Sequence, residues 1–103
     1  MKIIFTTAPT KEGPAIVKTL LNNRLIGCGN LLEGARSLYW WDGEIQDEKE
    51  TVIFMETTED LSNAALEMLY QIHPYDVPKI VLLNPEKVNQ PYLEWLNSET
   101  QKL

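Results

Sequence analysis

The stretch "YWWDGEI", residues 39–45, decides the fold, because it sets an Asp-Gly pair between two runs of strand-forming residues. Such a pair is a strong short-range signal for a tight hairpin turn. Residues 25–41 before the turn are expected to be extended, and residues 44–57 supply the returning strand. The sequence therefore predicts a long β-hairpin.

Glycines interrupt the first arm of this hairpin at positions 27, 29 and 34. Glycine inside a strand often marks a bulge or a place where another segment approaches the backbone closely. We therefore expect at least one such irregularity before the turn.

The elements on both sides of the hairpin follow from hydrophobic spacing. In chain order they are a strand at 2–7, a helix at 13–23, the two hairpin arms, a helix at 61–72, a strand at 79–83 and a short helix at 92–99. Thr10 is the expected N-cap of the first helix, and Pro14 suits its first turn. The second helix is expected to end near His73, and Pro91 opens the last one.

The order β-α-β-β-α-β plus a terminal helix is the split βαβ, or ferredoxin-like, arrangement of the α+β class. Residues 1–103 are expected to form one domain in which two helices cover one face of a four-stranded antiparallel sheet. The other face needs cover unless it is polar. The adjacent Trp40 and Trp41 point to opposite faces, so one of them must find another partner.

The hairpin is oversized for a chain of 103 residues. An arm of ten or more residues is longer than roughly 30 Å, whereas a 100-residue domain has a radius of gyration of about 13 Å. We infer that the hairpin reaches onto a neighbouring subunit, which predicts an oligomer.

Composition excludes several classes of protein. Fifteen Asp and Glu against nine Lys and Arg give a net charge of −6, which repels nucleic acid. No apolar run approaches the roughly 18 to 20 residues of a membrane-spanning helix, and the N-terminus lacks the apolar core of a signal peptide. A single cysteine agrees with a reducing compartment, so the cytoplasm is the expected location.

His73, the only histidine, has two readings. At the end of a helix, followed by Pro74, it can serve as a helix stop whose ring bonds a carbonyl. Imidazole is also the commonest protein ligand of copper, nickel and zinc. The first role comes before the second, and we expect loss of His73 to affect binding more than folding.

Two further residues are candidate metal ligands. Cys28 is either a small buried hydrophobe or a thiolate ligand of Cu(I), and Asp76 lies three residues after His73 and can add an oxygen. One thiol and one imidazole cannot complete a tetrahedral site, so carboxylates or ligands from another chain are required. A site with so few ligands should bind weakly, at micromolar affinity, and prefer copper to zinc.

Five aromatic residues can either line a ligand cleft or fill the core and a subunit interface. They are Tyr39, Trp41, Tyr75, Tyr92 and Trp95. The carboxylates Glu56, Glu59, Asp60 and Asp76 have no spacing that favours general acid–base work over a solvated surface. Neither a Gly-rich phosphate loop nor a Ser-His-Asp or HExxH pattern is present.

The chain resembles a known family, the CutA divalent-ion tolerance proteins. The likeness rests on "IIFTTAP", "RLIGCGN", "SLYWWDGEI", "TTEDL", "HPYDVPKIV" and "PYLEWL". Its most specific parts are Ser37-x-Tyr39-x-Trp41-x-Gly43-x-Ile45, His73-Pro74-Tyr75-x-x-Pro78 and Tyr92-Leu93-x-Trp95.

The resemblance implies a ferredoxin-like protomer in a tight homotrimer, with long hairpins that extend the sheets of neighbours and a PII-like shape. It also implies an association with copper and other divalent metals. The chain departs from the family pattern in three places. Glu56 stands where a lysine is common, and Asp76 replaces a glutamate. The run Gly27 to Asn30 replaces the usual Ala-Cys-Val-Asn.

Three functions from different classes follow. The first is a non-enzymatic trimer of divalent-cation tolerance that binds metal, mainly copper, through His73, Cys28 and Asp76. The second is a PII-like sensor that binds a small ligand in clefts between subunits, an analogy of fold. An enzyme is the third.

Overall fold

The structure, a computed structural model, describes residues 1–101, so the last two positions of the expected 1–103 domain lie outside it. Its elements are β1 (Lys2–Ala8), α1 (Gly13–Asn22), β2 (Cys28–Trp41), β3 (Glu44–Thr57), α2 (Ser62–Ile72), β4 (Ile80–Leu83) and α3 (Gln90–Glu99). The strands form one antiparallel sheet in the order β2-β3-β1-β4. The predicted ferredoxin-like α+β fold is confirmed.

The hairpin turn consists of Asp42 and Gly43 alone, because Trp41 pairs directly with Glu44. Both turn residues have positive φ, 52° at Asp42 and 78° at Gly43. Positive φ at both central residues is the signature of a type I′ turn, whose twist matches that of the strands. The Asp-Gly prediction is therefore confirmed.

A bulge interrupts the pairing of β2 with β3 between Leu32 and Ala35. Gly34 lies inside it with φ +82°, a conformation that other residues adopt at a cost. From this bulge to the turn, β2 and β3 continue as a two-stranded ribbon; we call its residues 35–50 the overhang.

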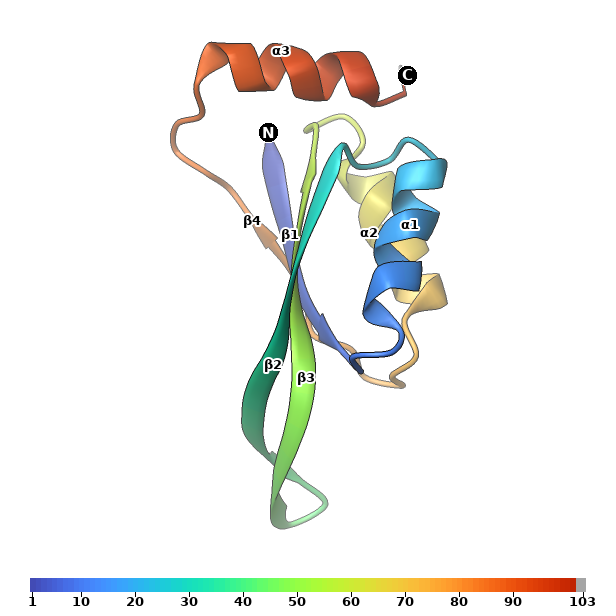
Figure 1. Ribbon diagram of the computed structural model, residues 1–103, viewed down its shortest axis with the longest axis vertical. Coiled ribbons are helices and arrows are strands. Elements are labelled where there is room, and N and C mark those ends of the chain that lie inside the picture. Colours follow the sequence, from blue (N-terminus) through green and yellow to red (C-terminus); the bar gives the residue numbers. More distant parts are fainter. Residues whose placement is uncertain (102–103) are drawn as a thin grey trace.

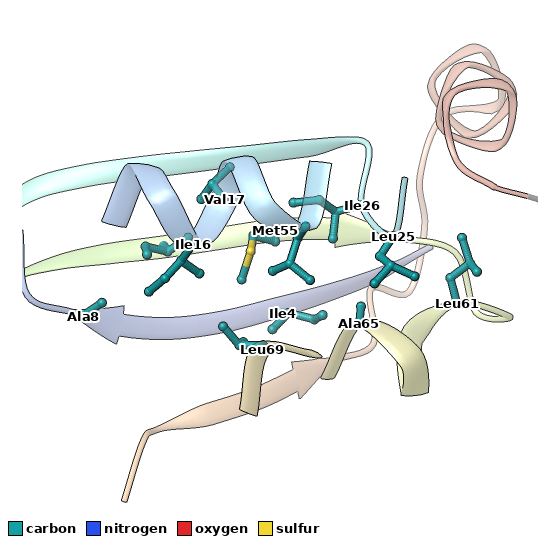
Figure 2. Packing of buried hydrophobic residues seen from close by; sticks show 12 residues of the cluster. Ile4, Ala8, Ile16, Val17, Leu25, Ile26, Met55, Leu61, Ala65 and Leu69 are labelled. Atoms are coloured by element: carbon teal, nitrogen blue, oxygen red, sulfur yellow. The ribbon is translucent and has the colours of Figure 1, made fainter. Parts of the chain in front are cut away.

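Helices α1 and α2 lie side by side on one face of the sheet, whereas α3 crosses its end beside the N-terminus (Figure 1). Alternate residues of β1 and β3, such as Ile4, Ile53 and Met55, are fully buried beneath the two helices. Figure 2 shows Ile4 and Met55 pointing toward Ile16 and Leu69, and Ile53 belongs to the same cluster. Within residues 1–101 no helix is long and apolar enough to cross a bilayer.

Two glycines of the first hairpin arm allow close packing. A Cβ atom on Gly29 would lie 2.5 Å from Cγ1 of Val17 on α1. One on Gly27 would lie 2.5 Å from Cδ1 of Leu96 on α3. The expected close backbone approach therefore occurs at both positions, and each brings a helix against the sheet.

The expected helix boundaries hold with one correction. Pro14 and Pro91 lie in the first turns of α1 and α3, and His73 is the C-cap of α2, as predicted. Thr10 is not the N-cap of α1: the cap is Glu12. The backbone N–H of Glu12 donates to the carbonyl of Pro9 at 3.0 Å, so a turn occupies these residues before the helix begins.

Residues 1–101 leave the face of the sheet away from α1 and α2, here the open face, largely uncovered. Phe5 and Phe54 stack on it with ring centroids 5.2 Å apart. Strand alternation puts Leu32, Val81 and Leu83 on the same face, where they are 58%, 37% and 39% exposed. The protein thus presents an apolar sheet face to its surroundings.

Both sides of the overhang also expose large apolar side chains among their polar residues. Trp40 and Trp41 point to opposite sides and are 72% and 55% exposed. Leu38 and Ile45 accompany Trp40, while Tyr39 accompanies Trp41. The overhang extends the longest dimension of the molecule to 45 Å. Neither tryptophan is buried by its own chain.

The contact of Gly29 with α1 predicts that Gly29→Ala destabilises the protein. The new methyl group forces Val17 aside, and overpacking of this kind typically costs about 1 to 3 kcal/mol. Asn30→Ala is the matched control, because Asn30 is exposed on the other face. Thermal unfolding should show a lower Tm for Gly29→Ala, and Val17→Ala in the same chain should restore part of it. Equal melting of both single variants would contradict the packing.

Candidate functional site

His73 is buried, and both of its ring nitrogens have partners. The backbone N–H of Tyr75 donates to Nδ1 at 3.2 Å. The ring proton therefore sits on Nε2, which donates to the carbonyl of Thr7 at 2.9 Å and lies 3.2 Å from the hydroxyl of Thr6. The histidine joins the end of α2 to β1.

This geometry agrees with the first role expected for His73, a helix end whose ring bonds a carbonyl. A metal needs an imidazole lone pair, and the lone pair of His73 is held by the N–H of Tyr75. Because removal of the ring strands buried groups on β1, loss of His73 should impair folding at least as much as binding.

The three predicted metal ligands do not gather within one chain. Cys28 pairs with Glu56, which pairs in turn with Ile3, whereas His73 contacts Thr7 farther along β1. Asp76 is exposed in the loop between α2 and β4. Among residues 1–101, no three His, Cys, Asp or Glu side chains are arranged to hold a metal ion. The predicted set does not fit a metal site formed by a single protomer.

Glu50, at the base of the overhang on β3, is a buried charged residue that is only 6% exposed. The hydroxyl of Tyr75 donates to its Oε2 at 2.6 Å. Burial by itself would raise the pKa of Glu50, but hydrogen bonds from Tyr75, Ser37 and Thr7, with the charge of Lys79, hold it below its ordinary value. Glu50 is therefore a carboxylate at neutral pH, fixed in place by its donors.

The pKa of Tyr75 is shifted upward, opposite to that of Glu50. Burial and the hydrogen bond to the Glu50 carboxylate both raise the pKa of the Tyr75 phenol, so it stays protonated. Together His73 and Tyr75 tie the loop after α2 to two strands, β1 and β3.

A groove of about 970 Å³ runs between this loop and the overhang. Tyr39, Trp41 and Tyr75 line it together with Asp76, so the structure gathers four of the predicted site residues there. The hydroxyl of Tyr39 donates to Oε1 of Glu48 at 2.7 Å, and this bond raises the pKa of the phenol. The groove thus combines aromatic walls with carboxylates.

Tyr92 and Trp95 lie elsewhere. Their rings pack against each other on α3 with centroids 5.3 Å apart. The Tyr92 hydroxyl donates to Glu56, which together with burial raises the pKa of the phenol, and Cys28 adds to the effect. The five predicted aromatics therefore form two clusters, one in the groove and one beside α3.

Sequence reasoning missed six charged residues of the groove: Arg36, Asp42, Glu44, Glu48, Glu50 and Lys79. A usable signal existed for two of them. A two-residue turn at 42–43 fixes the register of both arms, so alternation puts Glu48 and Glu50 on the same side as Tyr39. The loop that brings Lys79 to the groove has no comparable signal.

The fold places the protein in a structural class. The sheet order, the two helices on one face and the long hairpin are those of ferredoxin-like α+β proteins with PII-like relatives. One such structure is the PII-like protein CutA from Nostoc sp. PCC 7120, with a TM-score of 0.92 at 26% identity over 98% of each chain.

The chain belongs to the CutA1 divalent ion tolerance protein family, whose model matches residues 2–99. It is 46% identical to the divalent-cation tolerance protein CutA of Pyrococcus horikoshii, over 99% of this chain and all of that one. A crystal structure of CutA1 from Pyrococcus horikoshii superposes with a TM-score of 0.93, at 45% identity over 99% of this chain and 100% of that one. The resemblance inferred from the sequence is confirmed.

The Tyr75–Glu50 contact predicts a pH-dependent effect of Tyr75→Phe. The depressed pKa of Glu50 contributes stability above the ordinary value of 4.5, and that stability is lost as pH falls through the lowered pKa. Near pH 7 the variant should lose about 1.5 to 3 kcal/mol, the typical worth of a hydrogen bond to a charged group. Toward acid pH the difference from the natural chain should shrink, because Glu50 is then protonated in both.

The control for this prediction is Tyr39→Phe, which removes the same hydroxyl from the exposed carboxylate Glu48. An exposed bond of this kind contributes little, so its unfolding free energy should stay close to that of the natural chain. Denaturant unfolding between pH 3 and pH 7 measures both variants. Equal, pH-independent losses would contradict the role of Glu50.

Proposed function

We propose that this protein acts in divalent-cation tolerance as a homotrimer, in the cytoplasm, and that it binds metal ions without turning over a substrate. Membership of the divalent ion tolerance family supports the general role. The observation that carries the assembly is the uncovered apolar surface of the open face and the overhang.

The trimer explains two features that a single chain leaves unexplained. Monomers rarely expose a contiguous apolar sheet face or a long free strand edge, since both promote association. The overhang of one copy reaches past its own helices and has apolar residues on both sides, as needed for contact with a neighbour. Head-to-tail contacts form a ring where the rotation between copies closes, and a ring of three is the assembly that the family resemblance implies.

Metal binding is proposed to need more than one copy. Cys28 is half-buried; its thiol lies 3.9 Å from Oδ1 of Asn30 and also interacts with the hydroxyl of Tyr92. Asp76 is exposed. Ligands from a second copy beside either residue would complete a weak site, for which copper is the favoured divalent ion by its general affinity order.

A second candidate function is the binding of a small ligand. The groove between the overhang and the loop after α2 has the size of ligand pockets, about 300 to 1,000 Å³. The likeness to a PII-like protein favours this reading by analogy of fold.

The first test is the mass of the assembly. Light scattering at low micromolar concentration should give about three times the 11.8 kDa of one chain. A clean monomer would remove the basis for sites shared between copies.

The two tryptophans of the overhang should differ in their effect on assembly. Trp41 lies on the same side of the overhang as Tyr39 and the groove, and both residues belong to the family motif Ser37-x-Tyr39-x-Trp41. We therefore expect Trp41→Ala to weaken the trimer more than Trp40→Ala. Truncation of a tryptophan buried in an interface costs about 3 to 5 kcal/mol. Sedimentation at decreasing concentration measures the difference, and equal dissociation of both variants would count against this orientation.

Copper titration separates the proposed ligands. Calorimetry at neutral pH should show micromolar binding that weakens by about tenfold in Cys28→Ser, since thiolate is the softer ligand. His73→Ala should melt at a lower temperature without metal, and Asp60→Asn serves as a charge control. Unchanged copper affinity in Cys28→Ser would exclude the cysteine as a ligand.

A further inference from the structure

The loop between α2 and β4, residues 73–79, runs past the end of β1 and is attached there through one imidazole (Figure 1). We propose that this attachment is a pH-sensitive switch: when the neutral His73 ring takes up a proton, its bond to Tyr75 breaks and the loop is released from the sheet. Every group of the switch belongs to one chain. The inference therefore goes beyond the proposed function and does not depend on the assembly.

The partners of the His73 ring fit only its neutral form. Nδ1 must accept, because the group that faces it at 3.2 Å is the backbone N–H of Tyr75. Nε2 donates to the carbonyl of Thr7 at 2.9 Å. A protonated imidazole has two donors and no acceptor, so a proton on Nδ1 would face another N–H across this short distance. Protonation therefore breaks the bond to Tyr75 and leaves the bond to Thr7 in place.

The surroundings of the ring do not accommodate the new charge while the loop stays in place. The three hydrogen-bond partners of the ring are uncharged: the hydroxyl of Thr6, the carbonyl of Thr7 and the N–H of Tyr75. His73 is also only 7% exposed, so water has little access to it. A buried charge without a hydrogen-bonded counter-charge or water is costly. Movement of the loop relieves this cost, because it opens Nδ1 to solvent.

Glu50 on β3 is the charge connected most closely to the switch. It accepts hydrogen bonds from Tyr75 and Thr7, and both of these residues also bond to His73. The pKa of Glu50 is held below its ordinary value, so its carboxylate does not change charge near neutral pH. The Tyr75 phenol, whose ring centroid lies 5.0 Å from that of His73, has a raised pKa and stays neutral there as well.

The other charged side chains of these elements lie away from the ring. In the loop, Asp76 is exposed and Lys79 lies over an aromatic ring of the open face. The carboxylate of α2 is Glu67, which is exposed, and the charged residue of β1 is Lys2, at its opposite end. Histidine is the side chain that ordinarily changes its charge between about pH 5 and pH 8. In this region that side chain is His73.

Loss of the bond to Nδ1 spreads to β3 through one residue. Tyr75 carries both the N–H that bonds His73 and the hydroxyl that donates to Glu50 at 2.6 Å. When the backbone of Tyr75 moves, its hydroxyl cannot keep its place on the buried carboxylate. The loop then loses its contacts with both strands, whereas the bond from Nε2 to Thr7 keeps the end of α2 on β1. The switch thus loosens the loop and leaves the fold intact.

The proton can be followed directly, because His73 is the only histidine of the chain. Nuclear magnetic resonance on the intact protein should show the Cε1–H signal of the ring titrating between about pH 7.5 and pH 5.5. With the same midpoint, hydrogen exchange corrected for its intrinsic rate should show the loop losing protection by about tenfold, the worth of one hydrogen bond. Helix α1 should keep its protection. A ring that stays neutral in this range, or a loop that stays protected while the ring titrates, would overturn the proposal.

His73→Gln is the matched variant. The amide oxygen of glutamine can accept from Tyr75 and its amide nitrogen can donate to Thr7, yet glutamine takes up no proton. Loop protection in this variant should be the same at both pH values, and a loss equal to that of the natural chain would refute the role of His73. If the variant does not fold, the shared midpoint of ring titration and loop exchange in the natural chain still decides.

Light scattering at both pH values separates the switch from assembly. The mass of the natural protein should stay constant while the loop loses protection. A fall in mass with the same midpoint as the loss of protection would assign that loss to dissociation and overturn the inference. Copper binding does not enter these measurements, so a failure of the proposed role in metal tolerance leaves the test unaffected.

Discussion

The turn at Asp42 and Gly43 is the constraint on which the rest of the structure depends. With only two residues in the turn, Trp41 pairs with Glu44, and every later pair of the overhang follows from that register. A shift by one residue would move Tyr39 and Trp41 to the opposite side. The side that carries Glu48 and Glu50, and hence the groove itself, is set by this local preference for positive φ at two positions.

Buried hydrogen bonds fix the loop after α2, which faces the overhang across the groove. His73 bonds to β1 and Tyr75 bonds to Glu50 on β3, so the loop after α2 cannot move away from the sheet without breaking buried hydrogen bonds. The imidazole of His73, which first suggests metal chemistry, is therefore engaged in structural hydrogen bonds. It also places the Tyr75 ring in the groove, where carboxylates line the same space.

Much of the fold could be predicted from the sequence because its signals are local. Period-2 and helical spacing located the strands and helices, and the Asp-Gly pair located the turn. Thr10 was misjudged as a cap because a turn from Pro9 to Glu12 delays the helix, which hydrophobic spacing does not reveal.

The candidate site was harder to predict, because it depends on contacts between distant segments. The sequence identified Tyr39, Trp41 and Tyr75 as possible cleft residues but grouped them with Tyr92 and Trp95, which lie beside α3. The sequence did not reveal whether Cys28 lies near His73, and the β1–β3 and β2–β3 registers place the two residues apart within one chain. For Glu50, strand alternation indicates the side of β3 on which it lies, but not that the loop after α2 buries it there.

The central claim is that the overhang is covered by a second copy of the chain, and amide hydrogen exchange tests it most directly. In an isolated chain, the outward-facing amides of β2 in the overhang form a free strand edge and should exchange within seconds to minutes. The account predicts protection of these amides comparable to that of β1, independent of protein concentration in the micromolar range. Exchange at rates near those of an unstructured peptide would contradict it.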